Sequence, residues 1–193
     1  MAQALTVAVL VGSLRKASFT RKVAEALTKL SPEGFSYKHV GIGQLPLYNQ
    51  DLDDEGSPPE AWTAFRETIR ACDAVLFVTP EYNRSVPGGL KNALDVGSRP
   101  YGKSAWNRKP CAIVSVTPGA MGGFGANHHL RQSLVFLDMP MLNQPEAYIG
   151  HASDLVDDEF NVKNEGTRAF LKGFMEAFGR WTTTLVRARD AAA

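Results

Sequence analysis

The sequence lacks the features that mark membrane, secreted and disulfide-rich proteins. No apolar run approaches the roughly 18 residues that span a bilayer, and no basic segment precedes the apolar N-terminal stretch, so we expect no anchor and no signal peptide. The two cysteines, Cys72 and Cys111, lie far apart and form no C-x-x-C motif, so nothing in their spacing indicates redox-dithiol or zinc chemistry. We therefore expect a cytoplasmic protein with free, buried cysteines.

The charged residues and histidines also narrow the classes of partner and site that we expect. The chain has 21 basic and 20 acidic residues, for a net charge of +1, which gives no reason to expect a nucleic acid or an anionic membrane as partner. The four histidines include one adjacent pair, His128 and His129, and no pair at helical i, i+4 spacing. We therefore expect no metal site, and place the adjacent pair on a helix surface or in a subunit contact.

Short apolar runs define the expected sheet. A chain of 193 residues suits a single domain over 1–193. Continuous β-branched runs at 5–11, 74–79 and 111–117 are typical of central parallel strands that are buried on both faces. Weaker strands are expected over 35–42, nearer an edge, and around 145–150.

Helical patterns alternate with these strands. They cover 18–30, 58–73, 87–98, 126–139 and 165–189, whereas 48–59 reads as a polar loop with a solvated acidic run. In the last helix we expect a buried stripe that contains Phe170, Phe174, Phe178, Trp181 and Leu185. Five alternations predict an α/β protein with a flavodoxin-like, doubly wound five-stranded parallel sheet of order 2-1-3-4-5. Its ligand site is expected at the carboxyl ends of the strands.

Hydroxyl and basic side chains follow the first strand. Ser18 fits the N-cap of the next helix, whose free N–H groups favour an anion. Ser13, Thr20 and Arg15 add further donors. Neither G-x-x-x-x-G-K-[ST] nor G-x-G-x-x-G occurs here. This loop therefore predicts a site for a phosphate monoester.

Two further loops follow the third and fourth strands. Pro80, Tyr82 and Asn83 offer a stiff turn, a flat aromatic face and an amide, which suit the rim of a heteroaromatic ring. The other loop contains Gly119, Gly122, Gly123 and Gly125, where backbone N–H groups can approach a ligand closely.

Three motifs carry a resemblance to a known family. These are "GSLRKASFTRKVA", "TPEYNRSVPGGLKNALD" and "HHLRQSLVFLD", and together with their surroundings they extend over nearly the whole chain. In them the sequence resembles the NADPH-dependent FMN reductase family, in its branch of bacterial quinone and chromate reductases.

The resemblance implies non-covalently bound FMN. NADPH or NADH would reduce the flavin, and a quinone, chromate or another oxidant would reoxidise it at the same ring face in ping-pong turnover, with no catalytic side chain required. A homodimer or homotetramer is also implied, in which the apolar stretch 133–142 would serve an interface or the core. The phosphate would contact Ser13, Arg15, Ser18, Phe19 and Thr20. The ring would contact Pro80, Glu81, Tyr82, Asn83, Ser115, Gly119, Met121, Gly122 and Gly123.

Basic residues between the third and fourth strands are candidates for binding the phosphates of the nicotinamide cofactor or an anionic acceptor. They are Arg84, Arg99, Lys103, Arg108 and Lys109, and the alternative is a solvated basic loop. Arg84 and Arg99 are the candidate substrate contacts.

Other functions remain open at this point. A flavodoxin-type electron carrier is usually strongly acidic, unlike this chain. A flavin reductase would use FMN as a diffusible substrate. A signalling receiver would need a phosphorylatable Asp where Thr79 and Pro80 stand.

Overall fold

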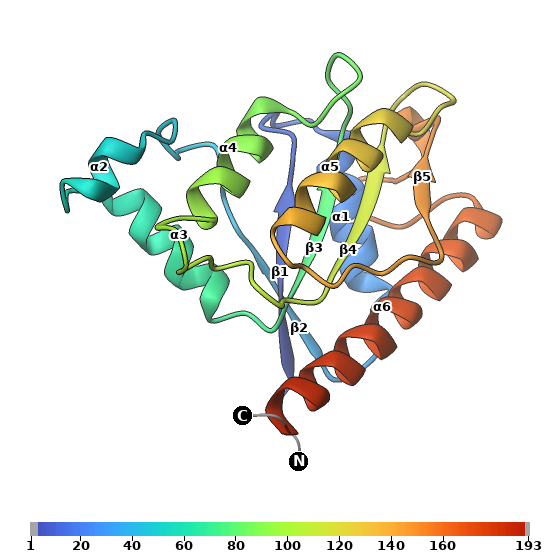
Figure 1. The fold of residues 1–193 in the computed structure, drawn as a ribbon. Helices are drawn as coiled ribbons and strands as arrows, with labels where there is room; N and C mark the ends of the chain where they lie inside the picture. The colour runs from blue at the N-terminus through green and yellow to red at the C-terminus, as the bar shows by residue number, and fades with distance from the viewer. Residues whose placement is uncertain (1–3, 192–193) are drawn as a thin grey trace.

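The computed structural model describes residues 4–191, in which five parallel strands form one sheet (Figure 1). The strand order β2-β1-β3-β4-β5 confirms the expected α/β, flavodoxin-like class. The strands are β1 (Leu5–Val11), β2 (Phe35–His39), β3 (Ala74–Thr79), β4 (Cys111–Val116) and β5 (Ala147–Ile149).

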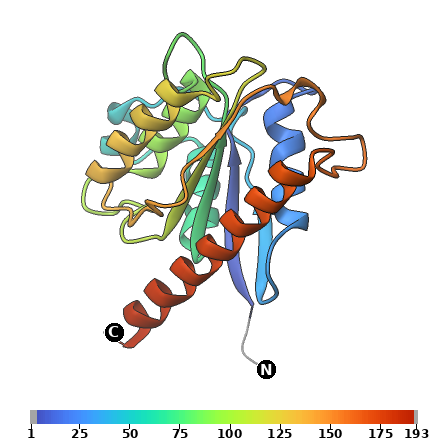
Figure 2. The same cartoon turned by 90° about the vertical axis from the view of Figure 1, so that its right-hand side faces the viewer.

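Helices cover both faces of the sheet. α1 (Phe19–Lys29) and α6 (Glu165–Ala191) pack on one face, and α3 (Glu60–Arg70), α4 (Gly88–Gly97) and α5 (Phe124–Phe136) pack on the other (Figure 2). Two short helices, α2 (Gln50–Asp54) and η1 (Ala152–Asp154), lie in connections. The five long helices match the predicted segments, with ends that differ by a few residues.

The two layers of the core follow from the pleat of the strands. Along β1, Val7 and Val9 face α1 and α6, whereas Ala8 and Leu10 face the opposite helices. All residues of β3 and β4 are buried, as continuous apolar runs predict for central parallel strands.

The apolar stripe of α6 differs from the prediction at both ends, and at the C-terminal end Trp181 and Leu185 are only half-buried. Phe174 and Phe178 are 1% exposed, but Phe170 is 39% exposed. Leu171, at 0%, occupies the inward position instead. Because residues 171, 174 and 178 follow the i, i+3, i+7 spacing of one helix face, Phe170 lies at the border of that face.

The polar segment 48–59 is not an entirely solvated loop. It contains α2, and the Asp53 side chain is 4% exposed. Both Asp53 oxygens accept hydrogen bonds of 2.7 Å from Arg66 on α3, and Arg66 Nε donates to the Val96 carbonyl at 2.8 Å. Hydrogen bonding from Arg66 lowers the pKa of Asp53 below its ordinary value. The expectation of a solvated acidic run is therefore wrong for Asp53.

The stretch 133–142 divides between core and surface. Leu134, Met139 and Leu142 are buried, whereas Val135 and Phe136 are 70% and 81% exposed. The segment therefore contributes to the core, and the interface role of its exposed apolar side chains stays a prediction.

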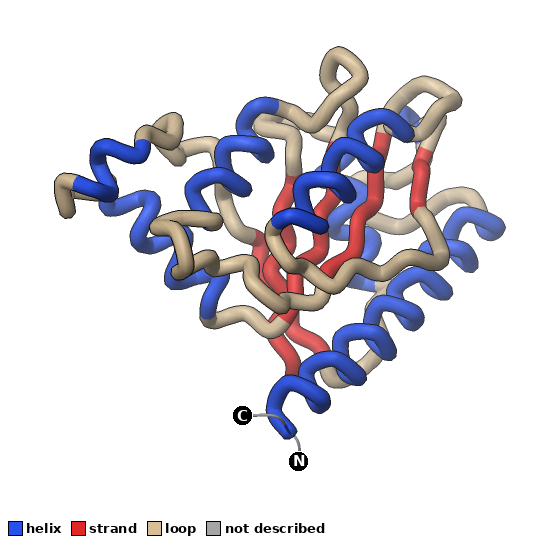
Figure 3. Tube along the Cα trace, in the orientation of Figure 1, coloured by secondary structure: helices blue, strands red, loops and turns tan. Residues whose placement is uncertain are grey.

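The connections after β1, β3 and β4 gather at the carboxyl edge of the sheet (Figures 1 and 3). Each following helix runs back toward the amino edge, where β1 begins and α6 ends. None of the helices within residues 4–191 combines the length and apolarity needed to cross a membrane.

Candidate functional site

Three loops meet at the carboxyl edge: the first loop (12–18), the second loop (80–87) and the third loop (117–123). Gly12 brings the first two together, since a Cβ at this position would lie 2.8 Å from Thr79 Oγ1 and 3.1 Å from Pro80 Cδ. The backbone N–H of Gly12 also donates to the Val78 carbonyl at 2.9 Å. The predicted phosphate and ring segments are therefore direct neighbours.

The first loop presents hydroxyl groups at the start of α1. Ser18 is the N-cap, and its Oγ accepts the Arg21 N–H at 3.2 Å. Ser13 Oγ accepts the Arg15 N–H at 3.4 Å. Because both oxygens act as acceptors in these contacts, their hydroxyl hydrogens are available to donate to a ligand. Thr20 is buried with them, at 3% exposure.

The electrostatics of this loop favour an anion. The first turn of α1 contains no acidic residue, and the N–H of Phe19 lies at its positive end. Arg15 and Lys16 are exposed on the loop. Hydroxyl donors, helix N–H groups and an exposed guanidinium are the donor set that a phosphate monoester requires.

The second loop is a tight turn that projects beyond β3 (Figure 1). Tyr82 and Ser85 exchange backbone hydrogen bonds of 3.1 and 3.0 Å. Asn83 and Arg84 between them both have positive φ, 51° and 64°. Asn adopts this conformation readily, but Arg does so at a cost of about 1 kcal/mol or more. The turn holds the Tyr82 ring 45% exposed at the carboxyl edge.

Two glycines of the third loop are required by the fold itself. A Cβ on Gly122 would lie 2.6 Å from the Tyr148 carbonyl carbon, and one on Gly123 would lie 3.0 Å from Ser115 Cβ. Both glycines also have positive φ, 60° and 76°. Packing within the protein therefore requires glycine at positions 122 and 123, and the approach of their N–H groups to a ligand stays a prediction. Gly119 faces open space, since a Cβ there would meet nothing within 4 Å.

Ser115 lies on β4, next to Gly123 of the third loop. The residue is fully buried, and its hydroxyl donates to the Ala147 carbonyl at 3.4 Å while accepting Asn127 Nδ2 at 3.3 Å. Asn127 is also fully buried and accepts Arg131 Nε at 2.9 Å. The Ser115 side chain is therefore engaged within the protein, and no sequence motif pointed to its partner Asn127.

Two side chains of the second loop turn toward α5. The Glu81 carboxylate accepts the Ala126 N–H at 3.0 Å. Arg84 Nη1 donates to Met121 Sδ at 3.3 Å, although Met121 is 61% exposed. The structure thus brings both residues beside the third loop, with Glu81 engaged by α5 and Arg84 at the surface.

The other basic candidates lie at the amino edge. α4 carries the chain about 15 Å along its axis, so that Arg99, Lys103, Arg108 and Lys109 follow it at the opposite end of the sheet. Within one chain, Arg99 is not brought to the three loops, and its role as a substrate contact stays a prediction.

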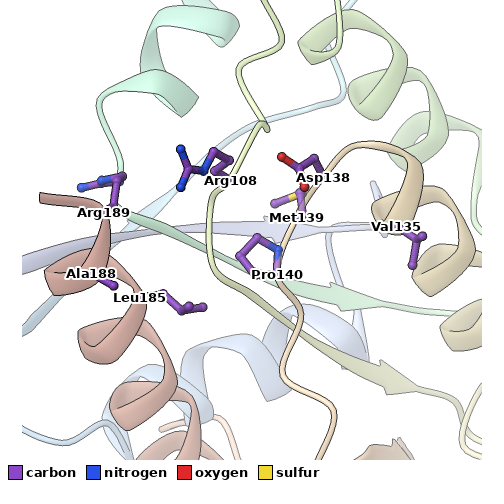
Figure 4. A pocket seen from close by; sticks show the side chains of 8 residues that line it. All are labelled: Arg108, Val135, Asp138, Met139, Pro140, Leu185, Ala188 and Arg189. Carbon is purple, nitrogen blue, oxygen red and sulfur yellow. The ribbon is translucent and has the colours of Figure 1, made fainter. Parts of the chain in front are cut away.

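Lys109 is buried rather than part of a solvated loop. It is 7% exposed, and its ammonium donates to the carbonyls of Arg70 and Cys72 beside the end of α3. Burial lowers the pKa of Lys109. Arg108 instead borders a cavity of about 460 Å³ between the loop after α5 and the end of α6, opposite Arg189 (Figure 4). This cavity is separate from the carboxyl edge.

A polar cavity adjoins the first loop. Its volume is about 480 Å³, and its lining includes Ser13, Leu14 and Arg21 together with the segment 39–44 that follows β2. Leu14 is 58% exposed and lies against Gly43 and Gly89. The sequence motifs did not predict this contribution of the segment after β2.

The two adjacent histidines point to different partners on the surface of α5. His129 Nδ1 lies 2.9 Å from Ser85 Oγ, and His128 Nε2 lies 3.0 Å from the Tyr148 hydroxyl. Burial raises the pKa of Tyr148 to about 12, so its hydroxyl stays protonated at neutral pH. Among residues 4–191, no three His, Cys, Asp or Glu side chains are grouped so as to hold a metal ion.

Comparison with known proteins gives consistent relatives. The family model described as "NADPH-dependent FMN reductase" matches residues 5–154. A quinone reductase of Pseudomonas putida is 64% identical over 181 residues, which cover 94% of this chain and 96% of the relative. A 2-hydroxy-1,4-benzoquinone reductase of a Burkholderia species is 48% identical over 178 residues, with 92% and 96% covered.

A solved structure agrees with these sequence relatives. The flavoenzyme NAD(P)H:(acceptor) oxidoreductase FerB of Paracoccus denitrificans superposes with a TM-score of 0.88 at 40% identity, covering 94% of this chain and 98% of the other.

Proposed function

Since the chain belongs to the NADPH-dependent FMN reductase family, we propose that it is an NAD(P)H-dependent quinone reductase that uses FMN. When bound, FMN supplies the redox chemistry, taking a hydride from NAD(P)H and passing two electrons to the acceptor. The protein's part is to bind and orient the flavin and to leave one ring face open.

The observation that carries this proposal is the donor set at the start of α1. Ser13 and Arg15 lie on the first loop, Ser18 caps α1, and Phe19 and Thr20 lie in its first turn, which contains no acidic residue. We assign these five residues to the FMN phosphate.

We assign the ring to the second and third loops. Pro80, Tyr82 and Asn83 would border it on one side, and Gly119, Met121, Gly122 and Gly123 on the other. The exposed Tyr82 and Met121 side chains leave this region accessible to a second planar molecule. Glu81 and Ser115 would hold the loops in place rather than bind the ring through their side chains. The Glu81 carboxylate is hydrogen-bonded to Ala126, and the Ser115 hydroxyl is hydrogen-bonded to Asn127 and Ala147.

The acceptor and the oligomer are finer parts of the proposal. We propose a quinone as acceptor, with chromate as a further oxidant, and either NADPH or NADH as donor. We also propose a homodimer or homotetramer, because the apolar side chains of Leu14, Tyr82, Met121 and Phe124 are 45–61% exposed near the loops. Light scattering on the purified protein tests the association.

The function is tested by two measurements on the purified protein. We expect yellow protein with FMN close to one per chain, and oxidation of NADPH or NADH by 1,4-benzoquinone without a partner protein. A pure electron carrier would retain FMN but show no turnover. A reductase of diffusible flavin would retain little FMN, and its rate would rise with added FMN. Either result would overturn the proposal.

A further inference from the structure

We propose that Glu81 is a positioning residue, whose carboxylate caps the N-terminus of α5 and thereby fixes the second loop against the third. This inference rests on the proposed function, because it assigns the two loops to opposite edges of one FMN ring. The proposal is about the residue that fixes the distance between the second and third loops, and not about the residues that touch the ring.

α5 begins without a cap of its own. Its N-cap residue is Gly123, which adopts a left-handed conformation and has no side chain to accept a hydrogen bond. The first N–H groups of a helix need acceptors, and a side-chain oxygen usually supplies one. Here the acceptor is Glu81, whose carboxylate takes the Ala126 N–H at 3.0 Å across 45 residues of sequence.

The environment of Glu81 fits a fixed structural contact. Its side chain is only 13% exposed, and the nearest cation, Arg84 Nη1, lies 3.7 Å away with its own side chain 74% exposed. The carboxylate faces the positive end of α5, where a negative charge is favourable. An ionised carboxylate in this position attaches the second loop to the helix more firmly than a neutral group would.

Close packing reinforces the same contact. A Cβ on Gly125 would lie 2.8 Å from the Arg84 carbonyl oxygen and 2.9 Å from Glu81 Oε2. Two surface contacts lie beside it, from Arg84 to Met121 at 3.3 Å and from Ser85 to His129 at 2.9 Å. The second loop is therefore held along the first turns of α5, with Glu81 as its most buried polar contact.

The contact has a direct consequence for cofactor binding. The turn at Asn83 and Arg84 is strained, and a strained turn keeps its geometry only when its surroundings hold it. Without the carboxylate, the second loop should sample other positions in the apoprotein, and FMN would have to order it on binding.

The test compares three variants of the full-length protein. Glu81→Ala removes the cap, and Glu81→Gln keeps an oxygen acceptor without the charge. Asn164→Ala removes a comparable cap from α6, where Asn164 Oδ1 accepts the Thr167 N–H at 2.8 Å. FMN affinity is measured by fluorescence titration of the apoprotein, unfolding by urea, and exchange of the Ala126 amide by hydrogen–deuterium exchange.

We expect Glu81→Ala to weaken FMN binding about tenfold and to accelerate exchange at Ala126. Glu81→Gln should restore most of the affinity, and Asn164→Ala should lower stability without changing either readout. The proposal is overturned if Glu81→Ala binds FMN as wild type does, if Gln is as impaired as Ala, or if Asn164→Ala weakens FMN equally. Wild-type protein that binds no FMN would instead refute the proposed function, while the exchange comparison would still test the contact.

Discussion

The loops at the carboxyl edge and the packed layer of α2, α3 and α4 contain similar polar side chains but use them differently. In the packed layer, Arg66 binds Asp53 through two hydrogen bonds and Val96 through a third. At the carboxyl edge, Arg15 is exposed on its loop, and the buried hydroxyl of Ser18 keeps a hydrogen to donate. A basic residue in the first region stabilises the fold, whereas one in the second is available to a ligand.

This difference predicts which quantity a substitution in each region should change. Side chains engaged within the protein contribute to the free energy of unfolding, and side chains with free donors contribute to ligand affinity. A substitution should therefore move only one of these two quantities, except where the residue both holds the fold and borders the proposed ligand, as Gly12 and Ser18 do.

The largest effect is expected from Asp53→Asn. Breaking a buried ion pair leaves Arg66 charged and unpaired, which should lower the free energy of unfolding by about 3 to 5 kcal/mol. FMN affinity should stay within about twofold of wild type, since α2 does not border the three loops. Urea unfolding and flavin titration measure the two quantities. The exposed neighbour serves as control: Asp54→Asn should change stability by less than about 0.5 kcal/mol. A parallel loss of flavin affinity in Asp53→Asn would erase the distinction between the regions.

A substitution at the junction of the first two loops should move both quantities. In Gly12→Ala the new methyl group would meet Thr79 and Pro80, so we expect a stability loss of about 1 to 3 kcal/mol. FMN should also bind about tenfold more weakly, because the loops are pushed apart. Gly173→Ala on α6 is the matched control, as nothing lies within 4 Å of its Cβ position. Unchanged affinity in Gly12→Ala would show that the spacing of these loops does not matter for the flavin.

Ser18→Ala should lower both stability and FMN affinity, by less than Gly12→Ala does. Loss of the N-cap should cost about 1 kcal/mol of stability, and loss of one hydroxyl donor should weaken FMN binding about fivefold. Thermal unfolding and flavin titration check these values. Ser18→Thr, which keeps the hydroxyl, should recover most of the stability and most of the FMN affinity. If Ser18→Thr binds FMN as weakly as Ser18→Ala does, the hydroxyl does not donate a hydrogen bond to the phosphate.

The smallest effect concerns pH. Because hydrogen bonds from Arg66 hold the pKa of Asp53 below its ordinary 3.8, the ionised carboxylate stabilises the fold fully above that value and loses this contribution as pH falls through its folded pKa. The stability difference between wild type and Asp53→Asn should therefore be constant from about pH 8 to 5 and shrink below about pH 4. Urea unfolding at a series of pH values measures it. A difference that grows on acidification would contradict this sign.

The fold was largely predictable because its central strands are continuous apolar runs and its helices have regular spacing. The five strands follow from such local patterns, and their order follows from the doubly wound arrangement that five strand–helix alternations indicate. The pairing of Asp53 with Arg66 did not follow, because the two residues lie on different helices and their contact depends on how α2 packs against α3. An acidic run that looks solvated in sequence can thus contain one buried carboxylate.

The candidate site was predictable in position but not in side-chain detail. Motifs that follow parallel strands must meet at one edge, so the three loops could be placed together. The basic residues after α4 were expected near them, but the helix carries the chain to the opposite edge. The direction of Glu81 toward Ala126 and the burial of Ser115 depend on tertiary packing, which the motifs do not encode.

The most direct test compares FMN with riboflavin, which lacks the phosphate, in wild type and in Arg15→Ala. If the first loop binds the phosphate, wild-type apoprotein should bind FMN at least about 100-fold more tightly than riboflavin. Arg15→Ala should reduce that preference about tenfold and leave riboflavin affinity unchanged. Equal affinity of wild type for the two flavins, or an Arg15→Ala variant that weakens both alike, would contradict the assignment of this loop.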